Sequence, residues 1–464
     1  MQEIANTAWA CAKLNVLSPT LFRAIEEHAV WIVENGNPQH IANISWACAT
    51  LNVQSPTLFR VIDGRADWIV KSGNPQEIAN IAWSFSKLAT LAVQFPSNVR
   101  VTSPSSLFRS IEENAAWLVT NGTPQEIANT ALSCATLNFH APSLFQSIDE
   151  NAAWLAANGN SQEIANTALA FANVGIRPKL LFSCLCNTHN THNTHNTHCL
   201  PEEGHLEGHL ERFLEKATPQ GVCNLAWSIA VLGIESGSYT DASSGSDASS
   251  GSDDDASLLL APLWGAALRD HSGDMVAKDL YQLAQVHLHA RASGVALFPA
   301  LPPALKVRMV EACRDTDEGG GEFEDECSRL LEEIGFEHER EVSPFGIGGD
   351  SRGGDTIIDG DTIIDGDGDD DFGDFLAIDM ACRERKVAVE YDGRSHFLTE
   401  LAPGAAENFG KENGKTAAKR RLLEQLGWKV VNVPFRDSVM LESKELKKSY
   451  LEGKLAEVGV VIGT

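Results

Sequence analysis

Three carboxylates near the C-terminal end of the chain stand where two predicted strands finish, so their side chains could share a metal ion. Asp379 lies at the end of the apolar run 375–380, and Glu390 and Asp392 lie at the end of the run 386–391. Carboxylates on adjoining strand ends can bind a divalent cation, which activates water against a phosphodiester. The three carboxylates are therefore candidate catalytic residues, and Asp379 and Glu390 are the candidate ligands of a divalent cation such as Mg²⁺.

Further polar residues extend this candidate site. His396 follows Asp392 by four residues, and a predicted helix over 415–426 supplies charge that can pair with phosphate. The basic residues of that helix are Lys415, Lys419, Arg420 and Arg421. A plainer interpretation is a set of solvated strand-end acids beside an ordinary basic helix face, and spacing alone favours it.

An α/β domain is needed to bring these side chains together. The pattern predicts an amphipathic helix (322–334), an extended piece, the strands 375–380 and 386–391, the basic helix, a strand (428–434) and a final helix (443–455). This domain is predicted over 322–464, with an acidic loop inserted at 346–372.

A second group of residues recurs with a period of 37 over residues 1–182. The glutamines that mark the period are Gln2, Gln39, Gln76, Gln125 and Gln162, with an insertion near 92–102. Each unit predicts two helices, so the predicted fold is an α-solenoid of 37-residue helical hairpins. Capping boxes such as Asn74 with Glu77 begin the first helix. A left-handed glycine is expected to end the second, at Gly36, Gly73, Gly122 and Gly159.

One face of the first helix carries an amide pair, an apolar group and a variable last residue, at spacing i, i+4, i+7 and i+11. We call this set the amide stripe. Its members are Gln2, Asn6, Trp9, Lys13; Gln39, Asn43, Trp46, Thr50; Gln76, Asn80, Trp83, Lys87; Gln125, Asn129, Leu132, Thr136; and Gln162, Asn166, Leu169, Asn173, continued by Gln220, Asn224, Trp227 and Val231. Amides can read base edges and aromatic rings can stack on bases, so the stripe is a candidate surface for single-stranded RNA.

A structural interpretation of the stripe stands beside the RNA interpretation. Asparagine is a poor residue for a helix interior, and a ladder of its side chains bonded to the next unit would explain its recurrence. The tryptophans could in the same way pack between units. The variable last position is harder to explain by packing, because packing favours uniform residues.

Low-complexity tracts separate the folded parts. The predicted order is a helical-repeat array (1–182), a linker (183–216), a degenerate repeat (217–235), an acidic Ser/Gly linker (236–256), a helical segment (257–315) and the C-terminal domain. Histidines and cysteines at 184–199 could bind zinc, but repeat expansion explains the tandem triplets more simply. The ten cysteines are scattered, which is typical of reduced thiols.

The net charge of −27 would argue against nucleic-acid binding if it were spread evenly. Residues 1–182 carry only −3 and residues 376–464 carry +2, so the acidity belongs to the middle of the chain. No apolar run is long enough for a membrane span, and no membrane partner is expected. Because the chain begins inside a repeat unit, we expect a truncated N-terminus.

The run IDMACRERKVAVEYDGRSHF, followed by NGKTAAKRRLLEQLGWKVVNVPF, resembles the RAP domain (RNA-binding domain abundant in apicomplexans). The N-terminal repeats are similar to the octotricopeptide and heptatricopeptide repeats that accompany RAP domains in algae and parasites. The resemblance implies a restriction-endonuclease-like (PD-(D/E)xK) fold. It also implies single-stranded RNA of a mitochondrion or chloroplast as the partner, together with ribonucleoprotein partners.

On the nuclease pattern, Asp379 matches the first acid and Glu390 the second, whereas Asp392 occupies the place of the usual lysine. Lys415 or Lys419 could supply that lysine from the helix, and His396 resembles the histidine of mismatch-repair nicking enzymes. The sequence thus predicts an organellar RNA-binding protein of RNA processing, stability or translation, with no cofactor needed for binding. A Mg²⁺-dependent endoribonuclease and a protein-binding scaffold are the alternatives.

Overall fold

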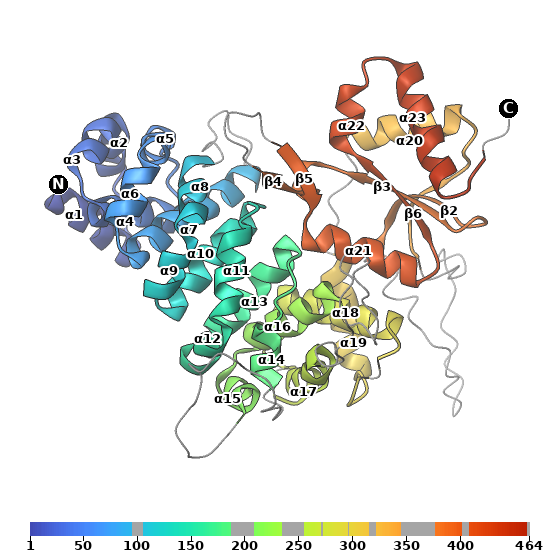
Figure 1. Ribbon diagram of the computed structural model, residues 1–464, viewed down its shortest axis with the longest axis horizontal. Coiled ribbons are helices and arrows are strands. Elements are labelled where there is room, and N and C mark those ends of the chain that lie inside the picture. Colours follow the sequence, from blue (N-terminus) through green and yellow to red (C-terminus); the bar gives the residue numbers. More distant parts are fainter. Residues whose placement is uncertain are drawn as a thin grey trace, which may run out of the picture. The chain divides into compact units, whose positions relative to one another are not determined.

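The computed structural model describes residues 1–94, 105–186, 208–233, 255–270, 272–295, 297–314, 322–344, 376–400 and 408–461 (Figure 1). The described residues divide into two compact units. Unit 1 holds residues 1–270 and 397–414, and unit 2 holds residues 271–396 and 415–464. The low-complexity tracts at 187–198, 241–252 and 355–366, the predicted acidic loop at 346–372 and most of the insertion near 92–102 lie outside the described residues.

Unit 1 is built from helical repeats, and the first four repeats each have one long and two short helices. The long helices are α1 (Gln2–Lys13), α4 (Pro38–Thr50), α7 (Pro75–Gln94), α10 (Pro124–Thr136), α13 (Ser161–Val174) and α16 (Pro219–Leu232). The short pairs are α2 (Pro19–Glu27) with α3 (Ala29–Asn35), α5 (Pro56–Gly64) with α6 (Ala66–Ser72), α8 (Ser105–Glu113) with α9 (Ala115–Asn121), and α11 (Pro142–Glu150) with α12 (Ala152–Asn158). The predicted second helix is therefore broken in two, at His28, Arg65, Asn114 and Asn151.

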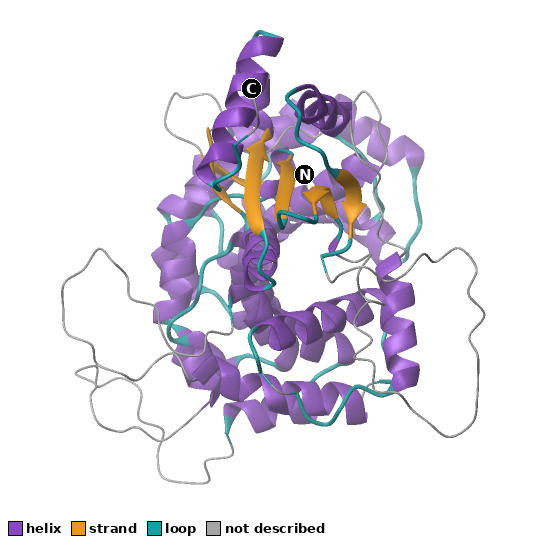
Figure 2. Ribbon diagram, turned by 90° about the vertical axis from the view of Figure 1, so that its right-hand side faces the viewer, coloured by secondary structure: helices purple, strands orange, loops and turns teal. Residues whose placement is uncertain are grey.

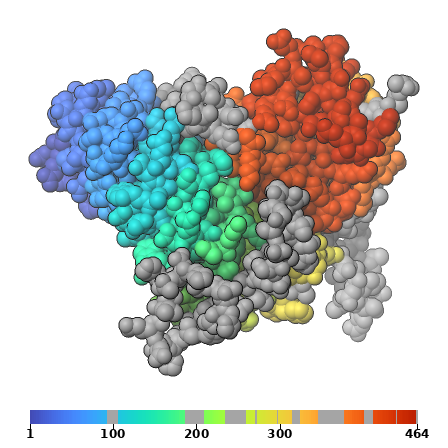
Figure 3. Space-filling model, viewed as in Figure 1, coloured from blue at the N-terminus to red at the C-terminus, as the bar shows by residue number. Residues whose placement is uncertain are grey.

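Successive long helices pack directly on one another, each against the next (Figure 1). Small residues line these contacts, including the fully buried Ala8, Ala47 and Ala82, and they let the helix axes approach closely. The short helices form a second layer, which packs on the long helices through buried aromatic residues. One example is Phe59, whose ring meets that of Phe85 edge-on, with 4.8 Å between the ring centroids. Figure 3 shows the repeats, coloured blue to green, in continuous side-chain contact.

The predicted capping boxes form, but the glycines work differently from the prediction. Asn74, Thr123 and Asn160 each accept a hydrogen bond from the backbone N–H three residues on. Gly36, Gly73, Gly122 and Gly159 are extended rather than left-handed, with φ between −87° and −75°. A Cβ at each would lie 2.7–2.8 Å from the carbonyl oxygen four residues back, so close approach explains the glycine. Left-handed residues instead follow four of the long helices, at Asn15, Asn52, Asn138 and Gly175.

A ladder of acidic side chains joins each repeat to the next. Each acid lies near the end of one short helix and accepts hydrogen bonds from the first backbone N–H groups of the matching helix one repeat later. The pairs are Glu26 to Thr57 and Leu58, Asp63 to Ser106 and Leu107, Glu112 to Ser143 and Leu144, and Asp149 to Lys179, Leu180 and Leu181. The carboxylates thereby cap these helices, of which α5 and α11 have no side-chain cap of their own.

The rest of unit 1 comprises α14 (Leu181–Cys186), α15 (His209–Lys216), α17 (Asp255–Asp270) and a hairpin of β4 (Phe397–Glu400) and β5 (Asn408–Glu412). Helices thus occupy part of the segment predicted as a linker. The hairpin packs on the ends of α10 and α13. Thr399 donates its N–H to Asn138 and accepts one from His140, and the Lys411 ammonium donates to the carbonyl of Gly175.

Unit 2 contains a four-stranded sheet in the order β1 (Glu339–Val342), β2 (Ile378–Cys382), β3 (Val387–Asp392), β6 (Lys429–Pro434). The first three strands are antiparallel and β6 is parallel to β3. Helices α20 (Glu322–Glu333) and α23 (Lys444–Glu457) cover one face, and α21 (Gly414–Gln425) covers the other. Unit 2 also includes α18 (Ala277–Ala292), α19 (Pro303–Arg314) and α22 (Phe435–Met440).

Helices dominate the described chain and strands are few (Figure 2). No described helix combines the length and the apolar character needed to cross a membrane. The helix and strand types predicted for the C-terminal domain are found within a few residues of their predicted bounds. The hairpin β4–β5 and the short α22 were not predicted.

Candidate RNA-binding stripe and carboxylate cluster

The amide stripe is accessible over the first five repeats. Its first members, Gln2, Gln39, Gln76, Gln125 and Gln162, are all exposed. Trp9 is 43% exposed, and Trp46 and Trp83 are partly exposed. Leu132 is partly exposed, whereas Leu169 is buried at 8%. The variable residues Lys13, Thr50, Lys87, Thr136 and Asn173 all keep some exposure.

The stripe asparagines do not form the predicted ladder. Within the described residues, no hydrogen bond joins the side chains of Asn6, Asn43, Asn80, Asn129 or Asn166 to a neighbouring unit. Asn6 is exposed, and the other four are partly exposed. The recurring side-chain hydrogen bonds between repeats come instead from the acidic ladder on the short helices. The asparagine amides consequently remain available to a ligand.

Lysines at the variable position lie over the tryptophans. The Lys13 ammonium is 5.4 Å from the centroid of the Trp9 ring and 5.0 Å from that of Trp46, in the next repeat. Lys87 lies 5.0 Å from the ring of Trp83. The aromatic faces and the cations therefore belong to one surface, and a cation within about 6 Å of a ring face interacts favourably with it.

The accessible stripe ends before the last repeat. On α16, Asn224, Trp227 and Val231 are only 2%, 3% and 2% exposed. The expectation that this degenerate copy continues the surface is therefore wrong for these three residues, and only Gln220 of this copy is exposed.

The carboxylate cluster lies on the α21 face of the sheet. Asp379 on β2 and Glu390 on β3 both face Lys419 of α21. The Lys419 ammonium lies 2.5 Å from Glu390 Oε2 and 3.9 Å from Asp379 Oδ1, and it donates to the carbonyl of Ala377 at 2.8 Å. Asp379 Oδ2 accepts the N–H of Tyr391 at 2.7 Å, which fixes the carboxylate against β3. The helix thus brings a lysine to the two acids, as one of the sequence hypotheses allowed.

Burial sets the proton affinities of this cluster. Burial, followed by the negative charge of Asp379, raises the pKa of Glu390 to about 8, although the Lys419 ammonium opposes the shift. Burial likewise raises the pKa of Asp379. Burial alone would lower the pKa of Lys419, but the charges of Glu390 and Asp379 outweigh it and the net shift is upward. The lysine is therefore held as an ammonium ion.

Asp392 forms a separate group with His396. Asp392 is 2% exposed, and its two oxygens lie 3.1 Å from His396 Nδ1 and 2.8 Å from the donating Asn432 amide. The Thr416 hydroxyl is 3.1 Å from the same histidine nitrogen. Asp392 thus orients His396, and both of its carboxylate oxygens have partners. The position that holds a lysine in the nuclease pattern therefore belongs to a different polar group here. Sequence reasoning missed Thr416 and Asn432, whose contacts depend on the tertiary fold.

The remaining basic residues of α21 have other surroundings. Arg420 makes an exposed ion pair with Glu424 at 3.4 Å, and Lys415 is exposed. Arg421 is partly exposed and lies near His289 of α18, whose pKa falls to about 3 through burial and then through this arginine. Of the two lysines proposed to reach the acids, the one that does so is Lys419.

A metal ion would have few ligands here. Among the described residues, no group of three or more His, Cys, Asp or Glu side chains lies close enough to hold a metal. Glu390 Oε1 is buried without a hydrogen-bond partner, which is the kind of oxygen that a cation would satisfy. Lys419 already supplies positive charge to both acids, so the residues fit an ammonium–carboxylate cluster better than a metal centre.

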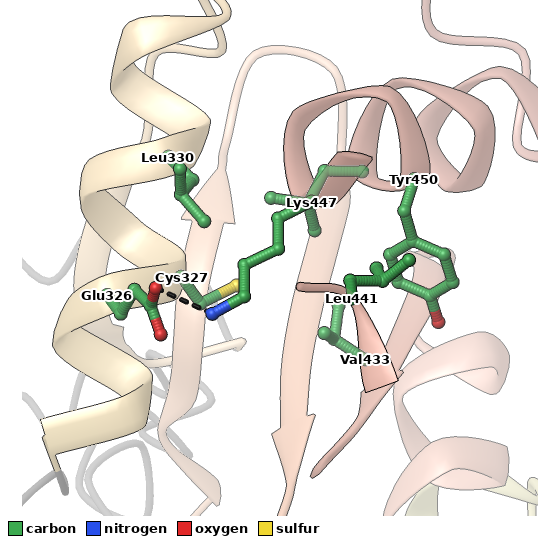
Figure 4. Close-up of a pocket in the computed structure, with 8 residues that line it drawn as sticks. Glu326, Cys327, Leu330, Val433, Leu441, Lys447 and Tyr450 are labelled. Atoms are coloured by element: carbon green, nitrogen blue, oxygen red, sulfur yellow. Dashed lines mark hydrogen bonds and ion pairs between the residues drawn. The ribbon is translucent and has the colours of Figure 1, made fainter. Parts of the chain in front are cut away.

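The opposite face of the sheet holds a small cavity between α20, β6 and α23 (Figure 4). Its volume is about 10 Å³, roughly that of a single water. The Lys447 ammonium crosses its edge to pair with Glu326 at 2.7 Å. The cavity is apolar and too small for a substrate.

A comparison with known protein families gives a match that lies in the C-terminal part of the chain. Residues 389–454 match the model of the RAP domain. The match spans Glu390, Asp392, His396 and Lys419, and it also includes the hairpin β4–β5. RAP domains are generally associated with RNA binding. Residues 389–454 of this helical-repeat chain are therefore similar to a RAP domain.

Proposed function

We propose that this protein binds single-stranded RNA in a sequence-selective manner and acts on organellar transcripts during their processing, stabilisation or translation. The observation that carries the proposal is the amide stripe of the first five repeats. Its asparagine amides make no inter-repeat bonds within the described residues, and Trp9, Trp46 and Trp83 lie beside lysines. In this proposal the repeats form an α-solenoid that selects the site. The RAP domain, with a restriction-endonuclease-like fold, engages RNA or a ribonucleoprotein partner nearby.

The arrangement of the stripe residues supports a role in binding RNA bases more than a purely structural role. Exposed Gln and Asn amides offer both donors and acceptors to base edges, and tryptophan faces can stack bases at about 1–3 kcal/mol each. Lys13 and Lys87 can pair with phosphate from the same surface. Since the array is nearly neutral overall, affinity should depend more on stacking than on charge, with a modest salt dependence.

Crosslinking to cellular RNA, with sequencing of the bound fragments, would identify the target. A synthetic oligonucleotide of that sequence would then be titrated against the variant Asn43→Ala/Asn80→Ala by fluorescence anisotropy. We expect at least tenfold weaker binding with an unchanged melting temperature. Asn121→Ala is the matched control, because Asn121 is exposed on α9 and lies off the stripe. Equal affinity of the stripe variant and the control would overturn the proposal.

An endoribonuclease is the second candidate, favoured by the placement of Lys419 between Asp379 and Glu390. In such an enzyme Lys419 would position the attacking water or stabilise charge on the phosphate. Purified protein, Asp379→Ala and Lys419→Met would each be incubated with target RNA and Mg²⁺. Cleavage by the wild type alone supports the nuclease. Equal cleavage by all three, or none by any, removes it.

A further inference from the structure

Four tryptophans on the short helices form a second periodic surface that the amide stripe does not include. They are Trp31, Trp68, Trp117 and Trp154, and we call them the short-helix tryptophan row. Trp31, Trp117 and Trp154 are 50%, 44% and 43% exposed. Their helices α3, α6, α9 and α12 follow one another in the order of the repeats (Figure 1). Tryptophans that recur at one position of four successive repeats, three of them exposed, indicate a binding surface.

In the second repeat the chain itself shows what this surface accepts. The Arg65 guanidinium lies over the ring of Trp68 at 4.1 Å and donates to the carbonyl of Val33, near the C-terminal end of α3 in the preceding repeat. The guanidinium of Arg212 donates in the same way to the carbonyl of Ala156, at the matching position of α12. Two arginines therefore bind the same place, where the negative end of a helix dipole favours a cation.

We call the tryptophan, together with the carbonyl of the preceding short helix, the frame. The third and fourth repeats have this frame, at Trp117 and Trp154, but they lack the arginine. Asn114 and Asn151 stand at the position of Arg65, and each donates its side-chain amide to its own preceding helix. One residue earlier, Glu113 and Glu150 are exposed, whereas the second repeat has Gly64 there. The acid is thus present where the chain supplies no arginine, and absent where it does.

We propose that the frames at Trp117 and Trp154 receive two arginine side chains of a basic partner polypeptide. Each arginine would stack on the tryptophan, donate to the carbonyl of Val70 or Val119, and face the nearby glutamate. Successive long helices pack on one another, and packed helices lie about 8–10 Å apart, so neighbouring repeats recur at about that spacing. An extended chain advances about 3.3 Å per residue. The partner segment therefore carries its arginines about three residues apart. RNA fits less well, because exposed carboxylates repel phosphate.

The test uses the full chain and a fluorescein-labelled peptide, Gly-Gly-Arg-Gly-Gly-Arg-Gly-Gly, with its lysine counterpart. We expect binding that weakens with salt, tighter for arginine than for lysine, since guanidinium stacks better on a ring. Trp117→Ala/Trp154→Ala should weaken binding at least tenfold. Asn114→Arg/Asn151→Arg, which keeps both tryptophans and fills the frames as Arg65 does, should weaken it as much without lowering the melting temperature.

Three outcomes would overturn the proposal. One is equal affinity of the wild type and the Asn114→Arg/Asn151→Arg variant. Another is equal binding of the arginine and lysine peptides. The third is loss of oligonucleotide binding rather than peptide binding in the tryptophan variant, which would assign the row to RNA. Failure of the RNA proposal would leave this test unaffected, because Asn43→Ala/Asn80→Ala changes neither frame.

Discussion

Glu112→Ala tests whether the acidic ladder holds the repeats together. The Glu112 carboxylate accepts the N–H of Ser143 at 2.6 Å and that of Leu144 at 3.0 Å, at the start of α11. This helix has nine residues and no side-chain cap from its own chain segment. Helices so short are marginal in water, so α11 depends on packing and on its cap.

The expected cost follows from the lost bonds. Removing a helix cap costs about 0.5–2 kcal/mol, and loss of the negative charge at the helix N-terminus is worth about 0.3–1 kcal/mol within that effect. Partial exposure of Glu112 screens its charge, so we expect about 1.5 kcal/mol for alanine. Glutamine keeps one acceptor oxygen and should lose roughly half as much.

Hydrogen exchange followed by mass spectrometry is the suitable assay, because repeat proteins open locally and a single unfolding free energy is poorly defined for them. At about 1.4 kcal/mol per tenfold change, exchange over residues 142–150 should quicken about tenfold in Glu112→Ala. The control is Glu113→Ala, one residue on and exposed. If both variants exchange alike, or if neither differs from the wild type, the carboxylate does not cap α11 in solution.

Three further predictions concern other parts of the chain. Glu390→Gln should flatten the pH dependence of urea unfolding. Because the pKa of Glu390 is raised from 4.5 to about 8, the folded state keeps a proton that the unfolded state loses, and wild-type stability falls as the pH rises from 4.5 to about 8. Identical pH profiles of stability for the variant and the wild type would refute this. Gly414→Ala should quicken hydrogen exchange of the hairpin β4–β5, because its Cβ would meet the carbonyl carbon of Ala172 at 2.9 Å, whereas Gly453→Ala, with nothing within 4 Å, should not. Burial raises the pKa of the Cys48 thiol to about 12, so iodoacetamide should modify Cys48 far more slowly than the partly exposed Cys11, and equal rates would contradict the packing.

Local signals in the sequence predicted the parts of the fold that depend on local interactions. The capping boxes formed as expected, since Asn160 and Glu163 need only three residues of helix to bond each other. The strands β2, β3 and β6 were visible as short apolar runs. The acidic ladder could also have been found, because Glu26, Asp63, Glu112 and Asp149 recur with the same period as the glutamines.

Other features depend on contacts that the sequence pattern does not encode. The break in the second helix falls on His28, Arg65, Asn114 and Asn151, which share no helix-ending chemistry, while the apolar period runs through it. The glycines after α3 and α6 predicted a left-handed helix end. The structure shows a different reason for glycine, because a Cβ there would lie too close to the carbonyl oxygen four residues back. The hairpin β4–β5 packs against residues more than two hundred positions earlier, which periodicity cannot reveal.

The carboxylate cluster shows the same limit at a functional site. Spacing identified Asp379 and Glu390, but it suggested a metal between them and left the lysine undecided between two positions of one helix. Lys419 faces the sheet because Leu422 and Leu423 of the same helix are buried against neighbouring elements. Packing of α21 therefore decides which cation the acids meet.

The two tryptophan surfaces of the repeats differ in the charge beside each ring. On the long helices, Lys13 and Lys87 lie over the stripe tryptophans, so the rings share their surface with cations and suit an anionic, stacking ligand such as RNA. On the short helices, Glu113 and Glu150 precede Trp117 and Trp154, so those rings suit a cationic ligand. If both proposals hold, the third and fourth repeats bind RNA on the long-helix layer and a basic polypeptide on the short-helix layer. Because the long helices carry the first surface and the short helices the second, substitutions in one layer should leave binding at the other intact.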